Sequence, residues 1–254
     1  MNRKVALVTG VSRLQGIGFA VCCELAKRGF DIFFTYWTDY DQSMPWGVAE
    51  DEPDTIQEKI NEFGGRCEKL ALNLAGDHAP EVLLEAVERT LGMPHVLVNN
   101  ATYSTQTTIE NLTADDLDKH YEVNLKATTL LTLDFIRRFD FDENGRIINL
   151  TSGQSLGPMP DEIAYAITKG AIETLTYTLS QRIASKGITI NAVNPGPNDT
   201  GWMDEKLKNE LTKQFPMKRV GKPEDTAKLI GFLVSEEAEW ITGQIIHSEG
   251  GFMR

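Results

Sequence analysis

Short runs of apolar residues alternate along this chain with longer segments in which apolar residues recur every three or four positions. The short runs, rich in valine and isoleucine, are typical of buried strands, and the longer segments are typical of helices that pack one face on a sheet. The predicted strands are residues 4–9, 31–35, 66–71, 95–99, 146–150, 188–193 and 244–248. The predicted helices are residues 19–28, 55–63, 79–91, 114–139, 165–185 and 223–234.

This order of about seven strands separated by helices predicts a parallel sheet covered on both faces, because parallel neighbours need a crossover connection. No linker or internal repeat interrupts the alternation. We therefore expect a single α/β domain, a Rossmann-like doubly wound sheet, over residues 1–254. Residues 36–53 form an unusually long connection, and residues 201–215 form an inserted helix or loop.

Composition places the chain among ordinary globular proteins. Of its 254 residues 41% are hydrophobic and 24% are charged, which leaves ample apolar material for a core. No apolar run approaches the roughly 18 residues of a membrane helix, and residues 1–13 lack the apolar core of a signal peptide. Cys22, Cys23 and Cys67 fit neither a disulfide framework nor metal-ligand spacing. We expect a cytoplasmic protein with reduced thiols, no bound metal and no membrane partner.

The chain is acidic, with 37 acidic and 25 basic side chains and a formal net charge of −12. Such a charge makes nucleic acid and anionic membrane surfaces poor partners. It also disfavours an acidic carrier protein as partner, unless a local basic patch exists.

A glycine loop follows the first predicted strand and precedes the first predicted helix. Strand, glycine turn and helix are the context of a dinucleotide-binding fingerprint, in which glycines let the backbone approach the pyrophosphate at a helix amino end. The spacing here is G-x5-G-x-G, and a plain turn at a helix start is the alternative interpretation. The loop residues expected to contact the cofactor are Gly10, Ser12, Arg13, Gly16, Ile17 and Gly18.

The end of the second predicted strand bears on the choice of cofactor. An acidic residue about 20 positions beyond the fingerprint usually binds the adenosine ribose of NAD. Tyr36 stands at that place, with Asp39 three residues further on, while Arg13 could meet a 2′-phosphate. This pattern favours NADP(H), with NAD(H) as the alternative.

Tyr165 and Lys169 are four residues apart, which is one helical turn, so their side chains share one helix face. A nearby cation favours an ionised phenol and moves its pKa towards the range useful for acid–base catalysis. Pairs at this spacing also arise by chance on solvated helix faces, so their companions decide the interpretation.

Five features in this order resemble the short-chain dehydrogenase/reductase family over essentially the whole chain. They are the glycine loop, the NNA run at residues 99–101, Asn124 in VNLKA, Ser152 thirteen residues before Tyr165 with Lys169 after it, and NPGPNDT at residues 194–200. The closing ITGQIIHSEGG is also similar to the last strand and turn of that family.

The resemblance implies a catalytic role for four side chains. Tyr165 would give a proton to a carbonyl oxygen, or take one from an alcohol. Lys169 would lower the tyrosine pKa and bind the nicotinamide ribose, and Ser152 would polarise the substrate oxygen. Asn124, through a local helix distortion, would support a water chain that resupplies the proton.

The resemblance also implies further cofactor contacts. Thr200 and the Pro195-Gly196 turn would lie along the nicotinamide, and Asn99 and Ala101 beside the cofactor; Asn73 stands where an aspartate often contacts adenine. For Thr200 and Asn99 a turn or capping role is a serious alternative. Two departures stand out, namely two extra residues in the glycine loop and a threonine, Thr102, where the family has glycine.

The implied function is an NADPH-preferring reductase that interconverts a ketone and a secondary alcohol, most similar to the 3-oxoacyl-acyl-carrier-protein reductase branch. Its substrate would be a 3-oxoacyl thioester, free or carrier-bound. The positions that match the basic carrier-docking residues of that branch are Leu130 and Lys186, so only one is basic. Enoyl reductases carry a tyrosine seven residues before the lysine, and that position here is Glu162.

Two alternatives remain. One is a dehydrogenase or reductase of a small sugar, alcohol or secondary-metabolite ketone. Its pocket would be shaped by residues 153–162 and 200–215. The other is a nucleotide-sensing protein without turnover, for which loss of Tyr165 or Lys169 would be expected. The resemblance further implies a homotetramer or homodimer, because the family pairs its two long helices across dimer axes.

Overall fold

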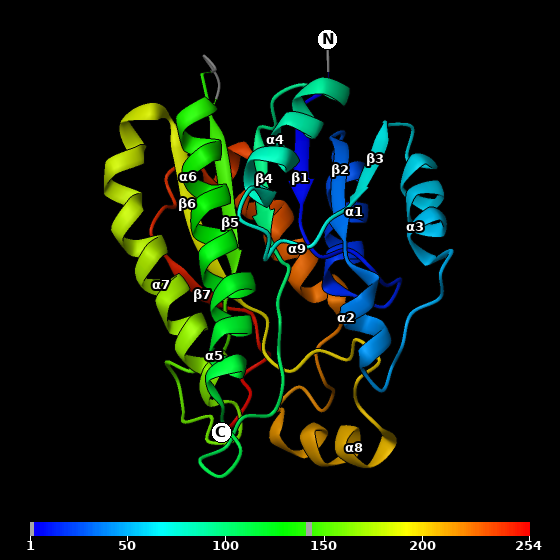
Figure 1. Cartoon of the computed structure of the whole chain (residues 1–254), viewed down its shortest axis with the longest axis vertical. Helices are drawn as coiled ribbons and strands as arrows, with labels where there is room; N and C mark the ends of the chain where they lie inside the picture. Colours follow the sequence, from blue (N-terminus) through cyan, green and yellow to red (C-terminus); the bar gives the residue numbers. More distant parts are fainter. Residues whose placement is uncertain (1–2, 141–143) are drawn as a thin grey trace.

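A parallel sheet runs through the middle of the molecule, with helices on both faces (Figure 1). The computed structural model describes residues 3–140 and 144–254. Within them, seven strands pair in the order β3-β2-β1-β4-β5-β6-β7, which confirms the predicted fold class. The strands are β1 (Val5–Val8), β2 (Asp31–Tyr36), β3 (Cys67–Ala71), β4 (Val96–Asn99), β5 (Gly145–Leu150), β6 (Ile188–Asn194) and β7 (Ile245–His247).

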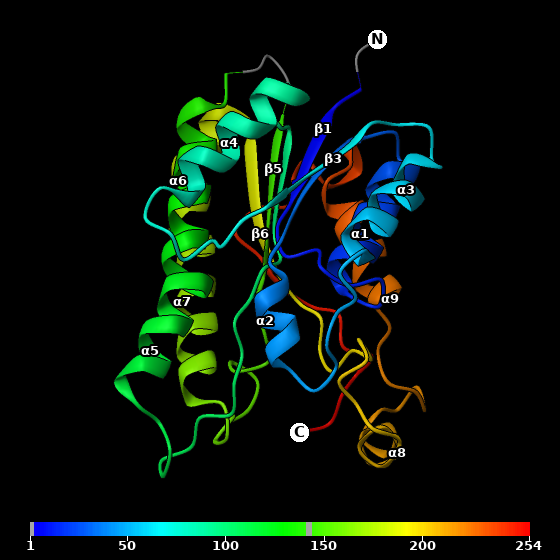
Figure 2. The same cartoon turned by 45° about the vertical axis from the view of Figure 1, so that its right-hand side comes forward.

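The helices form two layers, one on each face of the sheet. Figure 2 shows α1, α3 and α9 on one side and α4, α6 and α7 on the other. Their bounds are α1 (Ile17–Lys27), α3 (Glu52–Asn61), α4 (Ala79–Thr90), α6 (Thr128–Arg138), α7 (Ile163–Ile183) and α9 (Pro223–Leu233). Helix α3 begins three residues before its predicted start, because Pro53 is tolerated in a first helical turn.

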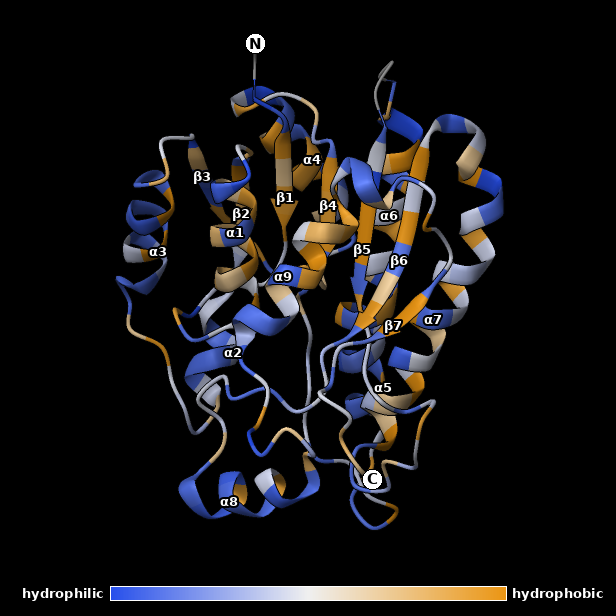
Figure 3. Ribbon diagram, turned by 180° about the vertical axis from the view of Figure 1, so that it is seen from behind, coloured by the Kyte–Doolittle hydropathy of each residue, from blue (hydrophilic) through white to orange (hydrophobic). Residues whose placement is uncertain are grey.

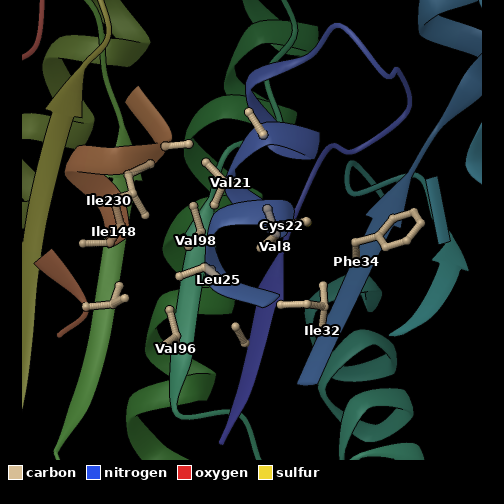
Figure 4. Packing of buried hydrophobic residues seen from close by; sticks show 14 of the residues in the cluster. Val8, Val21, Cys22, Leu25, Ile32, Phe34, Val96, Val98, Ile148 and Ile230 are labelled. Atoms are coloured by element: carbon tan, nitrogen blue, oxygen red, sulfur yellow. The ribbon is translucent and has the colours of Figure 1, made fainter. Parts of the chain in front are cut away.

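Two apolar clusters, one on each face, hold the layers together. Successive residues of a strand point to opposite faces, so on β1 Ala6 and Val8 join one cluster while Val5 and Leu7 join the other. Figure 4 shows Val21 and Leu25 of α1 among the side chains of the first cluster. Figure 3 shows the consequence for hydropathy, with apolar strands inside and polar outer helix faces. Strands buried on both sides read as continuous apolar runs, which is why the sequence predicted them.

Two segments differ from the sequence expectation in detail, and a third agrees with it. The long connection over residues 36–53 contains a short helix, α2 (Thr38–Ser43), whose polar residues have no helical apolar period. The helix expected over residues 114–139 is α5 (Ala114–His120), a π-helical segment (Tyr121–Ala127) and α6. Residues 201–215 contain α8 (Glu205–Gln214), which Figure 1 shows below the sheet.

The strand order creates a crevice beside β1. Strand β1 pairs with β2 on one side and with β4 on the other. The strand order therefore reverses at β1, and doubly wound sheets bind ligands at the carboxyl end of the strands at such a switch point. Gly10 follows β1 with φ of 73°, and a Cβ there would lie 2.5 Å from the Ala101 Cα. Glycine is therefore needed for the glycine loop to approach the NNA run.

No helix among the described residues is long and apolar enough to cross a membrane.

Candidate active site

A cavity of about 700 Å³ opens at the carboxyl ends of β1, β2 and β4. Its walls contain ten of the residues that the sequence assigned to the cofactor: Gly10, Ser12, Arg13, Gly16, Ile17, Gly18, Tyr36, Asn73, Ala101 and Thr200. The cavity lies at the amino end of α1, where backbone N–H groups favour a phosphate. Its size and walls fit the adenosine and pyrophosphate of a dinucleotide.

The two extra residues of the glycine loop are accommodated by contacts outside the sheet. The Leu14 N–H donates to the Glu52 carboxylate at 2.6 Å, which ties the loop to α3. A Cβ on Gly201 would collide with the Gln15 side-chain oxygen, so this loop also lies against the segment that leads to α8. The lengthened loop therefore contacts two neighbouring segments.

Arg13 lines the cavity but already has partners. Its Nε lies 3.0 Å from the Asp41 carboxylate, and its Nη1 donates to the Thr200 carbonyl oxygen at 2.8 Å. The guanidinium also lies 5.0 Å from the centre of the Trp46 ring, a cation–π distance. The charge of Arg13 in the cavity wall is thus partly balanced by Asp41.

Several cavity residues were not assigned to the cofactor from the sequence. Trp37, Asp39, Tyr40 and Asp41 come from α2 and the residue before it, and Asn100 comes from the NNA run. The Tyr40 hydroxyl donates to the Ser104 carbonyl at 3.0 Å, which fixes α2 over the cavity. The aromatic residues of this acidic connection could have indicated that it forms part of a binding site, because surface loops rarely contain so many aromatic residues.

Ser152 and Tyr165 are brought together by β5 and α7. Ser152 follows β5, Tyr165 lies in the first turn of α7, and the Ser152 hydroxyl lies close enough to the Tyr165 phenol to influence its pKa. Burial raises the pKa of the Tyr165 phenol, and the Ser152 hydroxyl opposes that shift. A phenol that stays protonated at neutral pH is suited to donate a proton to a carbonyl oxygen.

Lys169 lies one turn further along α7 and is almost fully buried, with 3% of its surface exposed. Its Nζ donates to the Leu150 carbonyl at 2.9 Å and lies 5.5 Å from the centre of the Tyr165 ring. Burial lowers the pKa of Lys169 to about 8. Burial is the largest influence on the phenol in this structure, so the lowering of the Tyr165 pKa by Lys169 stays a prediction.

Asn124 lies in the π-helical segment, the local helix distortion that the sequence resemblance implied. Its Oδ1 accepts the Tyr103 N–H at 2.7 Å and the Thr102 hydroxyl at 3.1 Å. Its Nδ2 donates to the Tyr103 carbonyl at 2.9 Å and to the Thr168 hydroxyl at 3.1 Å. Asn124 therefore links the cavity wall to α7, and Thr102, the unexpected threonine, is one of its partners.

Asn99 lies outside the lining of the cavity, so its contact with the cofactor stays a prediction. It is buried, and its Nδ2 donates to the Thr132 hydroxyl at 3.0 Å and to the Asn149 Oδ1 at 2.8 Å. Asn149 in turn donates to the Thr176 hydroxyl at 2.9 Å. These bonds satisfy polar groups between the sheet and helices α6 and α7, so Asn99 has a structural role. The next residue, Asn100, lines the cavity instead.

Pro195 and Gly196 form the turn after β6 and are not among the cavity-lining residues. Gly196 has φ of 63°, and its N–H donates to the Asn194 side chain at 2.9 Å. Tyr165, Lys169, Ser152 and Asn124 also lie outside the lining of the cavity. The cavity and the catalytic candidates are therefore neighbouring regions joined through residues 102 and 103.

No cluster of metal-ligating side chains occurs within residues 3–140 and 144–254. The three cysteines are free, and burial raises the pKa of Cys23 to about 11 and that of Cys67 to about 12. Thiols with such pKa values are poor nucleophiles at neutral pH.

Comparison with known sequences places the whole chain among oxidoreductases. A family model described as enoyl-(acyl carrier protein) reductase matches residues 10–253. The uncharacterized oxidoreductase YjdA of Bacillus subtilis is 48% identical over 100% of this chain and 98% of its own length. The 3-oxoacyl-[acyl-carrier-protein] reductase FabG of Staphylococcus epidermidis is 33% identical over 98% of each protein.

Solved structures of oxidoreductases also superpose on nearly the whole chain. A short-chain dehydrogenase/reductase from Serratia marcescens superposes with a TM-score of 0.88 at 29% identity, covering 100% of this chain and 99% of the other. The angucycline C-6 ketoreductase LanV with bound NADP superposes with a TM-score of 0.87 at 30% identity, covering 98% and 95%.

Proposed function

Because this chain belongs to the short-chain dehydrogenase/reductase family, we propose that it is an NADP(H)-dependent oxidoreductase that interconverts a ketone and a secondary alcohol. The observation that carries the proposal is the Ser152–Tyr165 pair, which β5 and α7 bring together beside a cavity that fits a dinucleotide. A nucleotide sensor without turnover would not need this pair. Tyr165 and Lys169 are both present on one face of α7.

The cavity residues would hold the adenosine and the pyrophosphate, with the phosphates at the amino end of α1. Arg13 would bind the 2′-phosphate, which favours NADP(H); the NADP-bound relative LanV supports the same choice. When bound, the nicotinamide supplies or accepts the hydride. The remaining chemistry belongs to the side chains of this chain.

The proton would be handled at the Tyr165 hydroxyl. During reduction Tyr165 donates its proton to the carbonyl oxygen of the substrate, while the Ser152 hydroxyl donates a second hydrogen bond to that oxygen. Lys169, held by the Leu150 carbonyl, places a positive charge near the phenolate that is left behind. Asn124 is hydrogen-bonded both to the cavity wall and to α7. We place the resupply of the proton at this residue.

For the substrate we propose a 3-oxoacyl thioester, supported by the 33% identity with FabG. Lys186, the basic residue matched to carrier docking, donates its Nζ proton to the Ile136 carbonyl at 3.2 Å. This bond and the net charge of −12 favour a thioester that is not attached to an acidic carrier protein.

A small secondary-metabolite ketone is the second candidate, because the ketoreductase LanV superposes over nearly the whole chain. Reduction of an enoyl thioester is a third activity, since the family model is described by that name. Glu162 argues against it. The residue immediately precedes α7, and burial raises the pKa of its carboxyl group, but it offers no phenol seven residues before Lys169.

A substrate screen followed by cofactor absorbance tests the proposal. The panel contains a short 3-oxoacyl thioester, its carrier-bound form, the matching 2-enoyl thioester, and small ketones and sugars. We expect NADPH oxidation with the free 3-oxoacyl thioester and none with the enoyl thioester. Turnover of the enoyl thioester alone would contradict carbonyl chemistry, and turnover only of small ketones would move the substrate to the second candidate.

A further inference from the structure

An arginine near the end of the described chain packs beside the loop that follows Ser152. The Arg254 guanidinium forms a bidentate pair with Glu249, with Nη1 3.0 Å from Oε1 and Nη2 2.7 Å from Oε2. Their side chains are only 23% and 11% exposed. A two-bond arginine–carboxylate pair of this kind has a defined geometry, unlike most surface ion pairs.

The Arg254 side chain occupies space that only glycine leaves free. A Cβ on Gly153 would lie 2.8 Å from the Arg254 Cζ, and a Cβ on Gly157 would lie 2.7 Å from its Cδ. Both distances are shorter than a van der Waals contact. The guanidinium therefore lies directly against the backbone of the residue that follows Ser152.

Glu249 reaches the other side of the site. Its Oε2 accepts the Asn194 Nδ2–H at 2.9 Å, and a Cβ on Gly196 would lie 2.5 Å from the Glu249 Cβ. Asn194 and Gly196 belong to the end of β6 and the turn after it. The ion pair thus bridges the turn after β6 and the loop after β5.

The same segment also holds α8. The Met253 N–H donates to the Gln214 carbonyl at 2.9 Å, and the Phe252 and Phe215 rings lie 4.9 Å apart. Residues 249–254 therefore contact both segments that were expected to shape the substrate pocket, residues 153–162 and residues 200–215.

We propose that Arg254, paired with Glu249, is a positioning residue that holds the loop of residues 153–157 and thereby keeps the Ser152 hydroxyl beside Tyr165. The inference rests on the proposed carbonyl chemistry for its kinetic consequence. The loop has internal bonds of its own, from the Leu156 and Gly157 N–H groups to the Gly153 carbonyl, so its two ends are tied to each other. A displacement of about 1 Å of a group in the reacting geometry can cost roughly 100-fold in rate.

Arg254→Ala tests the proposal by kinetics. We expect kcat for carbonyl reduction to fall about tenfold or more, with the Kd of NADPH unchanged, because the cofactor cavity is not touched. Arg254→Lys keeps the positive charge but cannot form the bidentate pair with Glu249, so we expect an intermediate kcat. Arg137→Ala is the control, because it removes an exposed pair of 2.9 Å with Asp134 at the far end of α6. Equal kcat values for wild type and Arg254→Ala would overturn the proposal.

Gly153→Ala gives an independent route to the same displacement. The added methyl group would push the guanidinium away without removing it, and Gly153 has no positive φ that would oppose alanine. We expect Gly153→Ala to lower kcat by a similar factor, and the double variant Gly153→Ala/Arg254→Ala to lose no more than either single variant. Fully multiplicative losses would show that the two residues act separately, against the proposal.

Hydrogen exchange of the cofactor-free protein separates the inference from the proposed function. Arg254→Ala should speed exchange of the Leu156 and Gly157 amides relative to wild type and to Arg137→Ala. If wild type reduces no carbonyl compound, the proposed function fails, but faster exchange still supports the positioning contact. Unchanged exchange would overturn the inference, even if wild type is an active reductase.

Discussion

The ammonium group of Lys169 lies 5.5 Å from the centre of the Tyr165 ring, and it donates to the Leu150 carbonyl at 2.9 Å. Leu150 is the last residue of β5, two residues before Ser152. One buried cation therefore ties the start of α7 to the end of β5, the two elements that bring Ser152 and Tyr165 together. This position costs folding free energy, because burial disfavours the charged form of Lys169.

Replacing Tyr165 with phenylalanine should remove the proton donor and little else. We expect turnover to fall by orders of magnitude, since acid–base catalysis contributes roughly 100-fold to 10,000-fold. The Kd of NADPH should stay nearly the same, because Tyr165 does not line the cofactor cavity. Steady-state kinetics and fluorescence titration measure the two quantities. Unchanged turnover would exclude Tyr165 as the donor.

Replacing Lys169 with methionine should stabilise the fold while abolishing activity. At pH 7 the lysine is charged in both states, and the folded state bears the full cost of a pKa lowered from 10.5 to about 8. Between these pH values only the unfolded chain keeps its proton, so wild-type stability rises with pH. After allowance for the lost bond to Leu150, we expect a gain of about 1 to 2 kcal/mol at pH 7.

Urea unfolding of both proteins without cofactor, at pH 7 and at pH 9.5, measures this gain. The advantage of methionine should shrink at the higher pH. A methionine variant that is less stable than wild type at pH 7 would mean that the Lys169 ammonium stabilises the fold.

Replacing Asp41 with asparagine should strengthen the preference for NADPH. Asp41 accepts the Trp46 indole N–H at 3.0 Å and pairs with Arg13 at the same distance, so an amide of equal shape keeps the contact but removes the negative charge. The Arg13 charge is then free to attract a 2′-phosphate. We expect the Kd of NADPH to fall several-fold and that of NADH to change little.

Calorimetric titration of both cofactors measures this effect, with Arg13→Gln as the counterpart that should lose the preference. A wild-type protein that binds NADH as tightly as NADPH would overturn the role given to Arg13 and Tyr36.

A charge on the outer face of α7 should break an oligomer. Ile167 and Tyr177 of this helix are 60% and 66% exposed, and Leu117 and Tyr121 of the neighbouring segment are 41% and 50% exposed. The family resemblance places the dimer axis at the two long helices, and these exposed apolar side chains lie on them. We predict a dimer or tetramer in solution and a lower mass for Tyr177→Asp, both measurable by light scattering. A monomeric wild type would contradict the expected assembly.

The pattern of apolar runs was enough to predict the sheet and most helices, because strands buried on both faces are mostly apolar. It failed at α2, which has no apolar face, and it could not distinguish Asn99 from Asn100. Successive residues at a strand end point to opposite sides, and which side holds the cavity depends on strand order. The same limit applies to the Tyr165 pKa, which depends on burial that no local spacing reveals.

By itself the sequence determined the doubly wound fold, the glycine loop at the end of β1, and the spacing that aligns Tyr165 with Lys169 on one helix face. These are local properties, set by periodicities of two and of 3.6 residues. Only the tertiary structure decided that Arg13 pairs with Asp41, that Asn99 belongs to the core, and that Arg254 lies against Gly153. Such contacts join residues far apart in the chain, and they exist only because the packed sheet brings the ends of its strands to one edge.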